Sequence, residues 1–120
     1  MLLEFICTGD ELLSGQVTDT NSPWTEELLL RELGVQVSRV VLVGDDEAAI
    51  IEVLRAASER ADAVIVSGGL GPTDDDLTAG AAAKAQGRRL VSDPGARAQL
   101  EARSRSVGLT LTPNNLRQVQ

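Results

Sequence analysis

Three segments combine glycine with acidic residues in a way that could do chemistry: "TGDELLSGQVTDTN" from Thr8, "GDDE" from Gly44 and "SGGLGPTDDDLT" from Ser67. Glycine lets backbone N–H groups approach an anion closely, because it has no Cβ and adopts positive φ readily. Carboxylates repel a phosphate unless a cation lies between them, and Mg²⁺ is commonly held by one or two carboxylates plus substrate phosphates. The combination predicts a nucleotide or another phosphate-bearing ligand bound through Mg²⁺.

Helix capping and turn formation are competing explanations for the same residues. Asp45, Asp46 and Asp76 each precede a predicted helix, where aspartate is a favoured N-cap. The glycines are common turn formers. Their spacing matches neither the dinucleotide pattern G-x-G-x-x-G nor the P-loop pattern G-x-x-x-x-G-K-[ST]. From the residues alone, the structural explanation and the binding of a metal or phosphate both stay open.

The composition excludes several classes of function. There is no histidine and one cysteine, which removes Ser-His-Asp, Cys-His and histidine-ligated zinc chemistry as well as an internal disulfide. The net charge is -7 and the only lysine is Lys84, which argues against sequence-independent binding to nucleic acid. No apolar run approaches the roughly 18 residues of a membrane span. We therefore expect a cytoplasmic protein that binds neither nucleic acid nor membrane.

The sequence alternates between predicted strands and predicted helices. Strands are predicted at residues 2–7, 35–43 and 63–66, the last buried on both faces, with a short edge strand at 89–91. Helices are predicted at about 24–33, 47–60, 77–86 and 93–107, with another starting near residue 113. This alternation predicts one α/β domain with a mainly parallel sheet covered by helices on both faces.

The alternation also predicts where the acidic segments lie. In parallel α/β sheets, ligands bind beyond the carboxyl ends of the strands. All three acidic segments follow predicted strands, so Asp10, Asp45 and residues 74–76 are expected on one rim.

Four further residues have structural explanations. Ser22 and Pro23 are predicted as N-cap and first residue of the helix at 24–33. Trp24 is predicted in the core rather than as a base-stacking platform. Cys7 is predicted to be a buried, inert thiol, because nothing basic nearby in sequence would lower its pKa.

Four segments together carry a resemblance that covers essentially the whole chain. They are "TGDELLSGQVTDTNSPW", "VGDDEAAI", "SGGLGPTDDDLT" and "TPNNLRQ", in this order. They resemble the N-terminal domain of the CinA (competence/damage-inducible protein A) family. That domain is similar to the molybdopterin-binding domains of MogA, MoaB and MoeA. The resemblance implies a three-layer α/β/α sandwich with a mostly parallel sheet in residues 1–120.

The resemblance also implies roles for particular residues. Asp45 and Asp76 match the family's functional acids, and we expect them to bind the metal, with Asp76 and Asp75 as catalytic residues. Asp19 matches the "D-[ST]-N" motif of the first loop. The ligand and its phosphate are expected to contact residues of the first loop and of the glycine-rich loop, namely Gly9, Asp10, Glu11, Asn21, Ser67, Gly68, Gly69, Gly71, Pro72 and Thr73.

The activity associated with such domains is hydrolysis of the pyrophosphate of ADP-ribose to AMP and ribose 5-phosphate, with Mg²⁺ and K⁺. An alternative is a molybdopterin-binding or adenylylating domain, with a pterin phosphate as ligand. Leu70 weakens this alternative, since the adenylyltransferases have threonine there in "GGTG". A third hypothesis is a catalytically silent interaction domain. Homo-oligomers are common in the resembled families and are expected here.

The resemblance further implies that the family's N-terminal domain continues past "TPNNLRQ" and that full-length relatives add a C-terminal amidase domain. We therefore expect residues 1–120 to form an incomplete domain, without the amidase domain.

Overall fold

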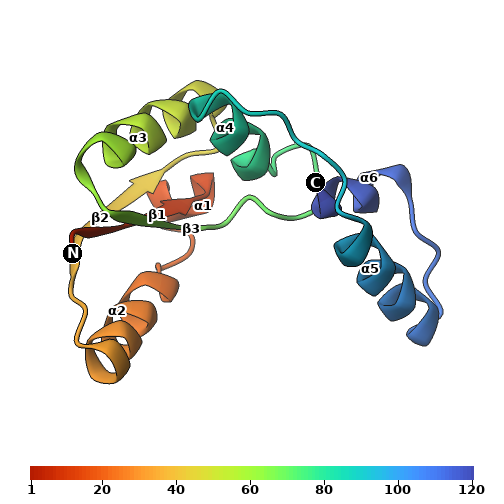
Figure 1. The fold of residues 1–120 in the computed structure, drawn as a ribbon, viewed down its shortest axis with the longest axis horizontal. Helices are drawn as coiled ribbons and strands as arrows, with labels where there is room; N and C mark the ends of the chain where they lie inside the picture. Colours follow the sequence, from red (N-terminus) through yellow and green to blue (C-terminus); the bar gives the residue numbers. More distant parts are fainter.

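The computed structural model describes residues 1–120 (Figure 1). Its elements alternate between strand and helix in the first two thirds of the chain and are helical thereafter. The strands are β1 (Leu3–Thr8), β2 (Val37–Val43) and β3 (Ala63–Ser67). The helices are α1 (Asp10–Leu13), α2 (Asn21–Leu33), α3 (Glu47–Arg60), α4 (Thr78–Ala85), α5 (Pro94–Ser106) and α6 (Pro113–Leu116), followed by the 3₁₀ helix η1 (Arg117–Val119).

The three strands form one parallel sheet in the order β2-β1-β3. Every residue of the central strand β1 is buried. Phe5 of β1 pairs with Val40 on one side and with Ile65 on the other. Because all strands run in the same direction, their carboxyl ends lie at one edge, and the loops that follow them meet there.

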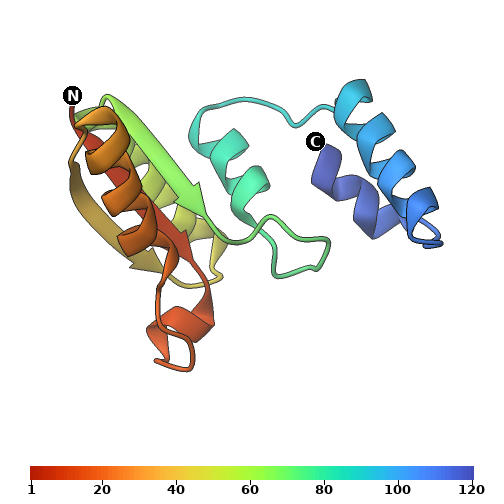
Figure 2. The same cartoon turned by 90° about the horizontal axis from the view of Figure 1, so that it is seen from below.

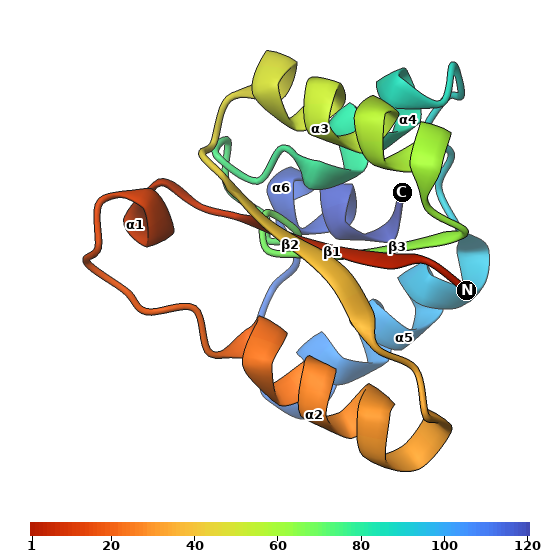
Figure 3. The ribbon, with the colours of Figure 1, turned by 90° about the vertical axis from the view of Figure 1, so that its left-hand side faces the viewer.

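Helices cover the sheet in layers. α3 and α4 lie over one face and α2 lies over the other (Figures 1 and 3). The core forms between the sheet and α3 with α4 and contains Ile6, Val43, Ile50, Leu54, Ala57 and Ala81. The predicted α/β architecture with a parallel sheet is confirmed. None of the helices has both the length and the apolar character needed to cross a membrane.

The last third of the chain lies beside this sandwich. α5, α6 and η1 sit together on the far side of α4 from the sheet (Figure 2). A backbone hydrogen bond of 2.8 Å from Asp93 N–H to the Val119 carbonyl ties the start of α5 to η1.

Three predictions about burial and strands are wrong. Residues 89–91 form no strand, because the chain leaves α4 through Gly87, at φ 62°, and runs toward α5 rather than along the sheet. Trp24 is 65% exposed, since its side of α2 faces away from the sheet. β3 is half-buried throughout, because it is an edge strand of the sheet.

The predicted start of α2 is also wrong. The helix begins at Asn21, so Ser22 and Pro23 lie within its first turn. The carboxylate of Asp19 accepts the N–H groups of Asn21 and Ser22, each at 3.1 Å, and Ser22 donates its hydroxyl to the same side chain. Asp19 therefore supplies the hydrogen bonds expected of a cap, although it lies one position before the N-cap residue, Thr20.

Candidate functional site

Two cavities lie where the loops meet at the carboxyl edge of the sheet, and they share no residue. The larger, of about 270 Å³, lies between the glycine-rich loop, the start of α4 and η1; its polar and loop residues include Gly69, Leu70, Gly71, Asp76, Arg117 and Gln118. The smaller, of about 150 Å³, lies between the ends of β1 and β3 and the first loop, and its lining includes Cys7, Thr8, Glu11, Asp19, Asn21, Ser67 and Gly68.

The glycine-rich loop is held by two threonine hydroxyls. Thr78 donates its Oγ1 hydroxyl to the Gly68 carbonyl at 2.8 Å. The Thr8 Oγ1 lies 3.3 Å from the Thr78 Oγ1 in a buried contact. Gly68 and Gly69 have φ of 99° and 63°. A Cβ on Gly69 would lie 2.3 Å from Thr78 Oγ1. The turn-forming explanation is therefore confirmed at both glycines, and their contact with phosphate stays a prediction.

Asp76 is not the N-cap of α4, so the capping explanation is wrong at this position. The cap position is Leu77, and no side chain caps the helix there. The Asp76 carboxylate instead turns back to accept the Thr73 N–H at 2.8 Å and the Thr73 hydroxyl at 2.6 Å. These bonds from Thr73, with a further contribution from the Gly71 backbone, lower the pKa of Asp76 below its ordinary value. Asp76 is therefore ionised at neutral pH.

The two aspartates that follow β2 have different partners. Asp46 caps α3 by accepting the Ala49 N–H at 2.8 Å, so capping is confirmed there. Asp45 does not cap the helix that follows it: its Oδ2 accepts the N–H of Asp10, the first residue of α1, at 3.1 Å. In return, Asp10 Oδ1 accepts the Asp45 N–H at 2.9 Å. A Cβ on Gly44 would lie 2.5 Å from that same oxygen, so the preceding glycine is required for the exchange.

The smaller cavity has a network of side chains on its wall. Asn21 donates its Nδ2 amide to Ser67 Oγ at 2.9 Å, which joins α2 to the end of β3. Burial raises the pKa of the Asp19 carboxyl, but hydrogen bonds from Ser22, Cys7 and Asn21 outweigh it, and the net pKa is lowered. Burial and the negative charge of Asp19 raise the pKa of Cys7 to about 11. Cys7 is buried, as predicted, and its thiol is protonated at neutral pH.

The structure brings some predicted site residues together and not others. The larger cavity collects Gly69, Gly71 and Asp76, and the smaller one collects Glu11, Asn21, Ser67 and Gly68. The remaining predicted residues line neither cavity: Gly9, Asp10, Asp45, Pro72, Thr73 and Asp75. No group of three or more histidine, cysteine or acidic side chains is placed to hold a metal ion. Metal binding by Asp45 and Asp76 stays a prediction.

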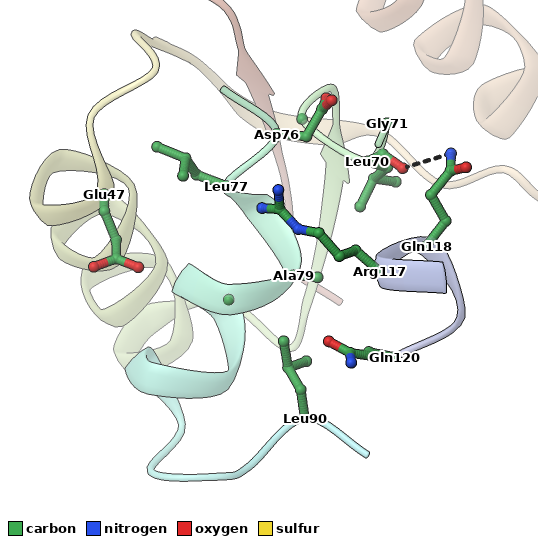
Figure 4. A pocket seen from close by; sticks show the side chains of 12 residues that line it. Glu47, Leu70, Gly71, Asp76, Leu77, Ala79, Leu90, Arg117, Gln118 and Gln120 are labelled. Atoms are coloured by element: carbon green, nitrogen blue, oxygen red, sulfur yellow. Dashed lines mark hydrogen bonds between the residues drawn. The ribbon is translucent and has the colours of Figure 1, made fainter. Parts of the chain in front are cut away.

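Two residues at this edge were missed from the sequence. Thr78 was not predicted as a site residue, although a hydroxyl next to the start of a helix is a typical anchor for a preceding loop. Arg117 places Nη1 2.9 Å from Asp74 Oδ1, and the neighbouring Gln118 donates its Nε2 amide to the Leu70 carbonyl at 3.3 Å (Figure 4). No local pattern reveals the Arg117 contact, because its partner lies 43 residues earlier.

The fold and the loops define an α/β domain that presents a glycine-rich loop and acidic side chains at the carboxyl edge of a parallel sheet. The family described as "Probable molybdopterin binding domain" matches residues 4–117. The chain is 50% identical over 119 residues to a "CinA-like protein" of Anaeromyxobacter sp. (strain Fw109-5). It belongs to the CinA family of proteins with this molybdopterin-binding-type domain.

Solved structures support this family assignment. The protein CinA of Thermoplasma acidophilum, of unknown function, has a TM-score of 0.85 and 36% identity, with 98% of this chain and 68% of that one covered. The molybdopterin biosynthesis enzyme MoaB of Thermus thermophilus has a TM-score of 0.65 and 27% identity, with 98% and 72% covered. The alignment with the Anaeromyxobacter protein covers 98% of this chain but only 28% of that relative's length.

Proposed function

We propose that this domain binds a phosphate-bearing small molecule at the glycine-rich loop and, with Mg²⁺, hydrolyses the pyrophosphate of ADP-ribose or a related nucleotide. The observation that carries this proposal is the state of Asp76. It is ionised and lies at the edge of the larger cavity, and both hydrogen bonds from Thr73 end on one carboxylate oxygen, Oδ2. The other oxygen, Oδ1, accepts neither bond, which leaves it available to a cation.

The donor set fits a Mg²⁺ that arrives with phosphate rather than one held in a protein cage. Mg²⁺ keeps several waters and is usually bound by one or two carboxylates together with substrate phosphates. Asp76 would supply one such carboxylate, with the exposed Asp75 next to it in sequence. No three acidic side chains are placed to hold a metal by themselves, which is compatible with this mode. When bound, the ion would neutralise charge on the phosphate oxygens.

The residues of the chain have separable tasks in this proposal. The loop backbone from Gly69 to Gly71 orients the phosphates, because it is fixed by Thr78 and lines the cavity. Asp75, next in sequence to the cavity-lining Asp76, would accept the proton of the attacking water. The new P–O bond forms as the bridging P–O bond of the anhydride breaks, and the second phosphate leaves with the other product. The cavity of about 270 Å³ is just below the size range of typical ligand sites, roughly 300–1,000 Å³, so it would take the phosphate-bearing part of a nucleotide rather than all of it.

Phosphorus NMR of ADP-ribose with the chain and Mg²⁺ tests the proposal, with and without K⁺ and with a chelated control. We expect AMP and ribose 5-phosphate to appear only when metal is present. Asp76→Asn should abolish this conversion while the circular dichroism spectrum stays that of a folded protein. An unchanged spectrum of ADP-ribose with metal and wild-type chain would refute the hydrolase proposal and favour the silent interaction domain.

Molybdopterin binding is a second candidate, favoured by the family match over residues 4–117 and by the likeness to MoaB. It uses the same edge of the sheet but needs no hydrolysis. Leu70 stands against it, since it replaces a hydroxyl-bearing residue of the adenylyltransferases and its side chain is 57% exposed at the cavity. Pterin fluorescence that persists on the chain through gel filtration would favour this candidate over the nucleotide hydrolase.

The proposed homo-oligomer is separate from both activities. Sedimentation velocity over a range of protein concentrations measures it directly, and a single species with the mass of one chain at all concentrations would refute it.

A further inference from the structure

Arg117 is the only basic residue that lines either cavity. The other charged residues of the larger cavity are Glu47 and Asp76. Glu47 is already neutralised, because both of its carboxylate oxygens lie 2.7 Å from Lys84 Nζ. Any anion that enters the larger cavity therefore has one cationic side chain to meet, and that side chain comes from η1.

The guanidinium of Arg117 has unused donors. Its one ion pair joins Nη1 to Asp74 Oδ1 at 2.9 Å. A guanidinium carries five N–H donors in a fixed fork that suits phosphate oxygens. The side chain extends from η1 across the cavity toward Leu77 and Ala79 at the start of α4, with Asp76 nearby (Figure 4). Donors that are not occupied by Asp74 are thus directed at the space that the glycine-rich loop borders.

The pair with Asp74 is easily exchanged. The Asp74 side chain is 96% exposed and that of Arg117 is 40% exposed, and exposed ion pairs contribute little because water screens them. η1 is held independently of Arg117, by the Gln118 side-chain amide on the Leu70 carbonyl and by the backbone bond from Asp93 N–H to the Val119 carbonyl. Arg117 can therefore leave Asp74 by a side-chain rotation alone.

We propose that Arg117 binds the phosphate of the ligand and that Asp74 holds its guanidinium while the cavity is empty. The proposal rests on the function proposed above, and it assigns the phosphate contact of that site to a residue of the last helical turn. Asp74 competes with the ligand for the guanidinium of Arg117 and so lowers the affinity for the ligand. A purely structural ion pair between η1 and the loop would have no such competition.

Isothermal titration with AMP in the presence of Mg²⁺ tests this exchange, since AMP carries a phosphate but no phosphoanhydride to hydrolyse. Arg117→Gln should weaken AMP binding at least about tenfold, as expected for loss of a charge-assisted hydrogen bond, and Arg117→Lys should fall between it and wild type. Asp74→Asn should tighten binding by about two- to fivefold, because it frees the guanidinium.

The double variant Arg117→Gln/Asp74→Asn separates competition from a general charge effect. If Asp74 acts through Arg117, the double variant binds AMP as weakly as Arg117→Gln alone. If Asp74→Asn tightens binding equally in wild type and in Arg117→Gln, Asp74 acts only by repelling phosphate, and competition for Arg117 is refuted. Weakening by both single variants would indicate a structural pair and overturn the proposal. Thermal unfolding of each variant, followed by circular dichroism, identifies any that do not fold.

Failure of the role of Arg117 can be told apart from failure of the proposed function. If wild type binds AMP and Arg117→Gln binds it equally well, the role of Arg117 is refuted while the nucleotide site stands. If wild type does not bind AMP, the role of Arg117 is overturned, and cleavage of ADP-ribose in the phosphorus NMR experiment decides the proposed function separately.

Discussion

Asp10 and Asp45 exchange hydrogen bonds reciprocally across two loops. The carboxylate of each accepts the backbone N–H of the other, at 3.1 Å for Asp45 Oδ2 and 2.9 Å for Asp10 Oδ1. The two residues follow neighbouring strands, β1 and β2, and lie 35 positions apart in sequence. The exchange fixes the entrance of α1 relative to the loop before α3, and so links the first two acidic segments of the carboxyl edge.

We expect Asp10→Ala and Asp45→Ala each to lower the free energy of unfolding by about 1 kcal/mol, the usual net contribution of one hydrogen bond. Because the two bonds close one ring, loss of one loosens the other, and the double variant should lose less than the sum of the two. Urea denaturation of the four proteins measures this coupling. Strictly additive losses would contradict the reciprocal arrangement.

Gly69→Ala should destabilise the chain more than Gly87→Ala, although both glycines have nearly the same backbone conformation, with φ of 63° and 62°. At Gly87 an added Cβ has nothing within 4 Å, so the variant carries only the strain of a left-handed residue, about 1 kcal/mol. At Gly69 the same Cβ would also lie 2.3 Å from Thr78 Oγ1.

Thermal or urea unfolding of the two variants gives the comparison. Gly87→Ala is the matched control because it isolates the backbone term. Equal losses in the two variants would mean that the contact between Gly69 and Thr78 contributes nothing to the position of the glycine-rich loop.

The ion pair of the buried Glu4 with Arg60 makes the stability of the fold depend on pH. Its side chain is 4% exposed and receives two hydrogen bonds from Arg60, at 2.6 and 2.8 Å, with Arg39 at 3.9 Å. The hydrogen bonds from Arg60 lower the pKa of Glu4 below 4.5, against the opposing effect of burial. A carboxyl with a lower pKa in the folded state stabilises the fold at pH values above its unfolded pKa. This contribution is lost as the pH falls from the unfolded pKa through the folded one.

We therefore expect stability to fall as the pH drops below about 4.5, with Asp19 and Asp76 adding to the loss below 3.8, since their pKa values are lowered too. Glu4→Gln should be less stable than wild type at pH 7 and should show a shallower decline between pH 5 and 3. Denaturant midpoints over this range measure both effects. A variant that kept the wild-type slope would show that Glu4 is not a source of the acid sensitivity.

Cys7 should react slowly with thiol reagents in the folded chain. It is buried, and its pKa of about 11 leaves very little thiolate at neutral pH, the form that reacts. Iodoacetamide labelling followed by mass spectrometry should give slow modification at pH 7.5 and rapid modification in 6 M urea. Fast labelling under native conditions would show that the smaller cavity admits the reagent to the thiol.

The residues that follow local rules could be predicted from the sequence, and those with distant partners could not. The alternation of apolar runs with helical patterns predicted the parallel α/β sheet, and Asp46 was among the predicted caps because its partner, Ala49, is three residues away. Asp45 and Asp76 fit the same cap pattern, but neither caps the helix that follows it. Their carboxylates bind, respectively, a backbone N–H 35 positions earlier and a loop residue that precedes the helix.

Exposure was predicted least well, for a related reason. Trp24 is typical of a core residue by type, but which side of α2 faces the sheet depends on how the helix packs. β3 is as apolar as a central strand, but its place at an edge is set by the strand order β2-β1-β3. The proposed role of Arg117 could not be predicted from the sequence, because it depends on the position of η1 beside the glycine-rich loop.

The central place of β1 has a consequence for how the chain folds. β1 precedes both of its partners along the chain, with Leu3 paired to Val37 on one side and to Ala63 on the other. No two strands that are consecutive along the chain form a local hairpin, so each pairing must close a long loop before it gains any contact. Synthesis must therefore proceed beyond Ser67 before the sheet can assemble. Until β2 has been made, "LEFICT" has both edges unpaired, and until β3 has been made it keeps one unpaired edge, which makes it prone to aggregation during folding.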